Sequence, residues 1–103
     1  MRKYEVLFIL NPDFTEDELK TIFAEISDIL SKHNAEITDT AQWGKKAFAH
    51  KIKGKKEGVY YLVEFNSEPD VVAKINREYR LHDKIFRANI MQKTEKKKEN
   101  IKF

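Results

Sequence analysis

The side chains that could do chemistry in this chain are three histidines, a run of acidic residues and a dense group of lysines. His33, His50 and His82 fall in three different expected elements and lack the spacing of a metal site. The acidic run 16–18 has a sufficient role at the start of a helix, where it complements the helix dipole. Glycine stands only at positions 44, 54 and 58, so no glycine-rich loop can cradle a phosphate. We therefore expect no enzymatic activity, no metal, no cofactor and no small-molecule substrate.

The lysines are concentrated in the stretch 44–58, whose net charge is +5. The stretch 93–103 carries +3, so the remainder of the chain carries −5. Like charges this close repel one another, and phosphate groups would offset them while releasing counterions. The pattern favours a polyanion as partner and supplies these RNA-binding candidates: Lys45, Lys46, Lys51, Lys53, Lys55 and Lys56. The alternative is a solvated hairpin tip whose lysines discourage aggregation between sheet edges.

This lysine-rich stretch has the pattern of a long β-hairpin. Residues 35–52 are expected to form one strand, in which Gly44 indicates a bulge or a close backbone approach. The turn is expected at 54–58, and the return strand at 59–65. Alternation then places one set of side chains on each face of the return strand: Val59, Tyr61, Val63 and Phe65 on one, Tyr60, Leu62 and Glu64 on the other.

Two helices and two further strands complete the expected fold. Thr15 and Glu18 predict a capping box at the start of the first helix, which ends near Asn34. Ser67 is expected to cap the second helix, which reaches Leu81. With strands at 3–10 and 85–91, the order is β-α-β-β-α-β. This order predicts a ferredoxin-like α+β sandwich, a four-stranded antiparallel sheet with both helices on one face and strands 3–10 and 59–65 in the centre.

Length and composition predict one domain, residues 1–92, followed by a basic C-terminal tail, residues 93–103, that is expected to be disordered. The chain has no cysteine, so it can form neither a disulfide nor a thiolate metal site. Its apolar runs are too short to span a bilayer. We expect no membrane partner and a cytoplasmic location.

One face of the expected sheet has no helix to cover it. The covered face should bury Tyr4, Val6, Phe8, Tyr61, Val63, Phe65, Phe86, Ala88 and Ile90. The opposite face carries Leu7, Ile9, Tyr60, Leu62 and Met91. Because monomers seldom leave large apolar patches open, we predict that these five residues form a protein interface, with a second copy of this chain as one possible partner. The alternatives are isolated surface side chains, or coverage by Ile101 and Phe103.

Tyr60 on an open central strand also invites comparison with the RRM, in which aromatic rings on such a sheet stack on RNA bases. The stretch 57–63 lacks the spacing of the RRM consensus. Strand 3–10 offers Leu7 and Ile9 where a second ring would be expected, and an aliphatic face suits a protein partner better. A stand-alone RRM-like RNA-binding module stays an alternative, as does a homodimeric ferredoxin-like regulatory domain that binds a small ligand.

The opening Met1–Val6, the segment Ile9–Pro12 and the stretch Gly44–Lys53 together resemble a known family. Arg80–Asp83 and Arg87 also fit its pattern. The chain is similar to the bacterial small-subunit ribosomal protein number six family over roughly residues 1–93. The resemblance implies a ferredoxin-like fold without catalytic activity, located on the central domain of small-subunit ribosomal RNA. It also implies that binding there is cooperative with small-subunit ribosomal protein eighteen, and it adds Arg2 and Arg87 to the RNA-binding candidates.

Overall fold

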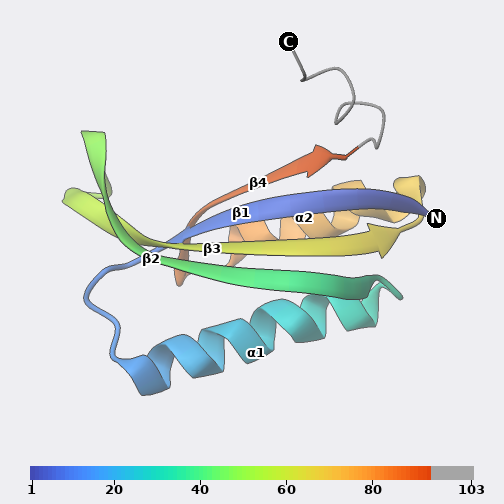
Figure 1. Cartoon of the computed structure of the whole chain (residues 1–103), viewed down its shortest axis with the longest axis horizontal. Helices are drawn as coiled ribbons and strands as arrows, with labels where there is room; N and C mark the ends of the chain where they lie inside the picture. The colour runs from blue at the N-terminus through green and yellow to red at the C-terminus, as the bar shows by residue number, and fades with distance from the viewer. Residues whose placement is uncertain (94–103) are drawn as a thin grey trace, which may run out of the picture.

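A computed structural model describes residues 1–93, which form a single four-stranded sheet and two α-helices (Figure 1). In chain order the elements are β1 (Arg2–Leu10), α1 (Glu16–Lys32), β2 (Glu36–Ile52), β3 (Lys55–Ser67), the 3-10 turn η1 (Pro69–Val71), α2 (Val72–Leu81) and β4 (Ile85–Gln92). Neighbouring strands are antiparallel, and their order across the sheet is β2-β3-β1-β4. The predicted ferredoxin-like α+β sandwich, with β1 and β3 central, is confirmed.

The hydrophobic core lies between one face of the sheet and the two helices. Alternate residues of β1 and β3 meet the apolar stripe of α1, whose buried members are Ile22, Ile26 and Leu30. Helix α2 contributes Ile75 and Tyr79, both fully buried. The Tyr79 hydroxyl donates a hydrogen bond of 2.8 Å to the Ile26 carbonyl, so this large side chain satisfies its one polar atom inside the core.

Helix α1 begins and ends as its local sequence predicts. The Thr15 hydroxyl accepts a hydrogen bond from the Glu18 backbone N–H at 3.2 Å, and the Thr15 N–H donates to the Glu18 carboxylate at 2.8 Å. This reciprocal pair is the expected capping box. At the other end Asn34 has φ +61°, the left-handed conformation that stops a helix.

The predicted cap of the second helix is wrong. Ser67 is the last residue of β3, where it is fully buried and paired with Arg2 in the ladder. Its hydroxyl donates to the Glu68 carbonyl at 3.0 Å and does not cap a helix. The extended backbone that strand pairing imposes delays the helix, and the turn that starts at Pro69 leads into α2.

The hairpin between β2 and β3 is longer and tighter than predicted. Its turn consists of Lys53 and Gly54, with φ of +52° and +79°, and β3 begins at Lys55 instead of Val59. Positive φ at both central residues matches the twist of the flanking strands, which explains why two residues suffice. The bulge predicted at Gly44 is confirmed, because the pairing register shifts between Gln42 and Gly44.

The expected core positions of β4 are partly wrong. Ala88 and Ile90 pack against the core as predicted, but Phe86 does not belong to it, and the buried residue at this end is Ile85. The β1–β4 register shifts between Ile9 and Leu10, which places Ile85 opposite Leu10. A one-residue shift changes which side chain points inward, and simple alternation cannot anticipate it.

Candidate RNA and protein interfaces

The end of the β2–β3 hairpin extends beyond the main body of the sheet (Figure 1), and all but one of the hairpin lysines are exposed. Lys45, Lys46, Lys51, Lys53 and Lys56 are exposed and have no ion-pair partner among residues 1–93. Lys55 differs, because its ammonium lies 2.5 Å from the Asp13 carboxylate. The sequence-based set of six therefore divides into five uncompensated cations, which we call the free lysines, and one that is already neutralised.

The two arginines predicted to bind RNA lie at opposite ends of the molecule. Arg2 begins β1 and pairs with Ser67, at the end of the sheet remote from the hairpin (Figure 1). Arg87 on the edge strand β4 pairs with Ile9, close to where the hairpin leaves the sheet. The structure therefore brings Arg87 to the basic end of the molecule and leaves Arg2 about 23 Å away, since seven residue steps of roughly 3.3 Å separate Arg2 from Ile9 along β1.

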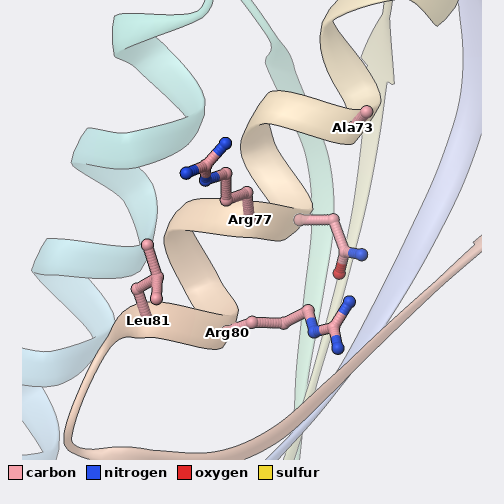
Figure 2. A pocket seen from close by; sticks show the side chains of 5 residues that line it. Ala73, Arg77, Arg80 and Leu81 are labelled. Carbon is pink, nitrogen blue, oxygen red and sulfur yellow. The ribbon is translucent and has the colours of Figure 1, made fainter.

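Two further arginines are not among the predicted RNA-binding residues, although Arg80 belongs to a segment that fits the family pattern. Arg77 and Arg80 are exposed on α2, where they line an open hollow of about 510 Å³ together with Leu81 (Figure 2). Arg80 also lines a second hollow, of about 280 Å³, that includes Arg87. Their spacing of three residues, which puts both on one side of a helix, was the available signal. These side chains extend the positive surface from the hairpin end around the β4 edge.

The face of the sheet opposite the helices, which we call the open face, is not uniformly apolar. Strand pairing arranges its residues in transverse rows, and three of these rows lie between the hairpin and a last row of Glu36, Asn66 and Lys3. The row nearest the hairpin contains Gly44, Tyr60, Ile9 and Arg87; the middle row contains Ala41, Leu62, Leu7 and Asn89; the far row contains Asp39, Glu64, Glu5 and Met91. The open face is therefore aromatic and basic at one end, aliphatic in the middle and acidic at the other end.

The acidic end already holds one cation. The Lys93 ammonium lies 3.1 Å from Glu64 and 3.8 Å from Glu5, and the Lys93 backbone N–H donates to the Lys3 carbonyl at 2.8 Å. The chain therefore still pairs with β1 at Lys93, the first residue of the predicted basic tail. The rest of that predicted tail, 94–103, lies outside the described residues.

For one of the five predicted interface residues, Ile9, the prediction of an open surface position is wrong. Ile9 is only 8% exposed. The hairpin bends so that the Phe48 ring lies over Gly58 beside Ile9; a Cβ at position 58 would be 2.7 Å from Phe48 Cζ and 2.8 Å from Ile9 Cγ2. Leu7, Tyr60 and Leu62 stay partly exposed. Met91 is 48% exposed in the far row, so four of the five residues remain accessible.

The hairpin also adds aromatic rings to the open face. The Trp43 ring stacks on Tyr60 with centroids 6.4 Å apart and planes 12° apart, while Phe48 lies 6.1 Å from Tyr60 on a tilted plane. Trp43 is 46% exposed. An RRM would carry its second ring on the first strand, where this chain has Leu7 and Ile9 as the sequence shows; the additional rings come from β2 instead.

Two of the three histidines, His33 and His82, have structural partners between the helices, whereas His50 is exposed on β2. His33 and Lys32 of the α1 end contact the two oxygens of Glu78 on α2, at 2.5 and 2.9 Å, and His82 contacts Glu25 at 2.7 Å. The His33 hydrogen bond, followed by that from Lys32, lowers the pKa of the Glu78 carboxyl. Over residues 1–93 no three histidine or acidic side chains are grouped to hold a metal ion, and no helix is long and apolar enough to cross a membrane.

Fold and surface together define a small ferredoxin-like α+β domain with a cationic end and an open sheet face. Comparison with known proteins supplies the family. The model of the family described as ribosomal protein S6 matches residues 3–92. The chain belongs to the ribosomal protein S6 family, whose members are structural components of the small ribosomal subunit and not enzymes.

Individual relatives agree with this assignment. The chain is 38% identical over 92 residues to the small ribosomal subunit protein bS6 of Caldanaerobacter subterraneus, covering 89% of this chain and 97% of that protein. It is 35% identical over 99 residues to bS6 of Helicobacter pylori, covering 96% and 69% respectively. The crystal structure of 30S ribosomal protein S6 from Thermotoga maritima superposes with a TM-score of 0.86 at 24% identity, over 96% of this chain and 94% of that one. At that identity the superposition confirms the fold.

Proposed function

We propose that this protein binds the central domain of small-subunit ribosomal RNA in the cytoplasm, cooperatively with small-subunit ribosomal protein eighteen. The observation that carries the proposal is the division of its surface: five free lysines at the hairpin end, beside a sheet face that is aliphatic in the middle and acidic at the far end. Phosphates suit the first region, and a protein suits the second.

The free lysines supply the RNA contact in this proposal. Their charges have no protein partner in the described part of the chain, so an approaching phosphate need not break an ion pair. Arg80 and Arg87, which line one hollow, extend the contact around β4. Such contacts position the protein on RNA but do not read its sequence. Selection of one RNA site therefore has to come from RNA shape or from the second protein.

The partner protein docks on the middle and far rows of the open face. Leu7 and Leu62 provide aliphatic contact area, and Met91 borders it. The acidic row at the far end favours a partner segment that presents lysine or arginine there. Once both proteins are joined, they offer RNA one continuous surface, which is the physical origin of the expected cooperativity.

The test is a gel-shift titration with the RNA fragment, this chain, and increasing amounts of protein eighteen. We expect weak, salt-sensitive binding by this chain alone and tight, saturable binding when both proteins are present. Tight, saturable binding by this chain alone would contradict the cooperative arrangement.

A pair of matched leucine variants locates the docking surface. Leu62→Ser should weaken partner binding. Leu81→Ser is the matched control, because Leu81 is equally apolar and 70% exposed. It lies at the end of α2 and not on the open face, so its substitution should leave partner binding unchanged. Equal effects of the two substitutions would mean that the partner does not dock on the open face.

A further inference from the structure

Among residues 1–93, Trp43 is the one large aromatic side chain of the open face that is substantially exposed to solvent. It occupies the bulge of β2 between Gln42 and Gly44, where Gly44 adopts φ +79°. A bulge re-aims a side chain out of the regular alternation, and here it turns the indole toward Tyr60. Because the Trp43 side chain is 46% exposed and Tyr60 backs one side of its ring, the other side is available to a ligand.

The orientation of the ring is fixed by its neighbours. The Trp43 and Tyr60 planes are within 12° of parallel, and Phe48 supports Tyr60 from a third position. Within residues 1–93 the indole N–H has no hydrogen-bond acceptor. An ordered aromatic surface with a free donor at its edge suits a flat, polar, aromatic ligand such as a nucleobase.

The charges around Trp43 select the chemistry of that ligand. Lys46 follows three residues later, is a free lysine and pairs with Gly58 on the same face of the sheet as Tyr60, while Arg87 lies across the sheet in the same transverse row as Tyr60. A base that stacked on Trp43 would carry its flanking phosphates past these cations. A cationic protein segment would be repelled here and attracted to the acidic row at the opposite end of the open face.

We propose that Trp43 is a stacking platform for an unpaired RNA base, with an adjoining phosphate held by Lys46. The inference rests on the proposed RNA binding and adds the class of nucleotide that the hairpin accepts. Bases in a regular duplex are already stacked on both faces, so the platform discriminates loops, bulges and ends from paired segments. Loss of one base–aromatic stack lowers affinity by about 5- to 160-fold.

The chain contains a single tryptophan, so its intrinsic fluorescence reports on Trp43 alone. At low salt, an RNA hairpin with a single-stranded loop should quench this fluorescence saturably, and a fully paired duplex of equal phosphate count should quench it much less. In the gel shift with the partner protein, Trp43→Leu should weaken binding of loop-containing RNA by the stated factor without changing the salt dependence. Trp43→Phe should restore part of the affinity, since it restores a ring.

The outcomes separate this inference from the proposed function. If RNA binds normally but neither quenches Trp43 nor responds to Trp43→Leu, the stacking inference fails and RNA binding stands. The inference also fails if Trp43→Leu lowers the affinity for loop-containing RNA and for duplex RNA equally. It fails as well if the partner protein, in the absence of RNA, quenches Trp43 fluorescence and binds the Trp43→Leu variant more weakly. If the chain and its partner together bind no RNA, the proposed function itself fails.

Discussion

The free lysines make a quantitative prediction about the salt dependence of RNA binding. Each phosphate that a lysine neutralises contributes about 0.7 to 0.9 to the slope of log K against log salt concentration. Lys46 is exposed and has no ion-pair partner among the described residues, so Lys46→Gln should lower the slope by nearly this full amount. Between 50 and 200 mM salt, a slope change of 0.9 corresponds to about a 3.5-fold smaller loss of affinity.

Lys55 is the matched control because it lies on the same hairpin but pairs with Asp13. To contact a phosphate it would first have to leave that carboxylate, which costs about 0.2–1 kcal/mol for an exposed pair. Lys55→Gln should therefore change both the affinity and the slope less than Lys46→Gln does. Both substitutions remove one positive charge, so the change in overall charge cancels in the comparison.

The assay is a filter-binding titration of the central-domain RNA fragment at four or five salt concentrations, with the partner protein held at saturation. Circular dichroism of each variant verifies that the sheet is intact. Equal slope changes for the two variants, or a slope that Lys46→Gln leaves unchanged, would refute the division of the hairpin into free and paired lysines.

Three further predictions concern stability. Gly58→Ala should destabilise the protein by about 1–3 kcal/mol in urea denaturation, since its Cβ would meet the Phe48 ring at 2.7 Å; an unchanged midpoint would show that the hairpin does not press on this face. Tyr79→Phe should cost about 1 kcal/mol through loss of a buried hydrogen bond, and a neutral effect would mean that water replaces it. The Glu78 pKa is lowered in the folded state, so its contribution is complete above pH about 4.3 and is lost as pH falls through the folded pKa. Glu78→Gln should therefore reduce the loss of unfolding free energy between about pH 4.3 and lower pH. If the variant loses as much stability at low pH as the unsubstituted protein, other carboxylates cause that loss.

The parts of this fold that the sequence predicts are those governed by local rules. The capping box at Thr15 and the left-handed Asn34 depend on residues within one or two turns, and both are confirmed. The order of the elements restricts the topology to few arrangements, since crossovers are right-handed and connections short. The element order therefore suffices to predict the sheet without knowledge of any long-range contact.

The errors occur where pairing register departs from strict alternation. Phe86 was assigned to the core and Ile9 to the surface because each was counted in steps of two along its strand. One register shift opposite Leu10 moves Ile85 into the core position, and the bend of the hairpin covers Ile9 with Phe48. Neither event has a signal within its own strand, because each depends on which residue of a distant strand lies opposite.

For the candidate site too, the sequence identifies the kinds of residue present, whereas their partners depend on the three-dimensional arrangement. Composition identifies the lysines of the hairpin, but only the structure reveals that Asp13 neutralises Lys55. Likewise alternation predicts that Glu64 lies on the open face with Tyr60 and Leu62, whereas its alignment with Glu5 and Asp39 in one acidic row depends on the pairing register, which the structure supplies. This polarity matters for assembly, since a partner attracted to the acidic row is directed away from the free lysines. In the proposed assembly, RNA and partner protein would then bind the two ends of one small domain at the same time without competing for the same side chains.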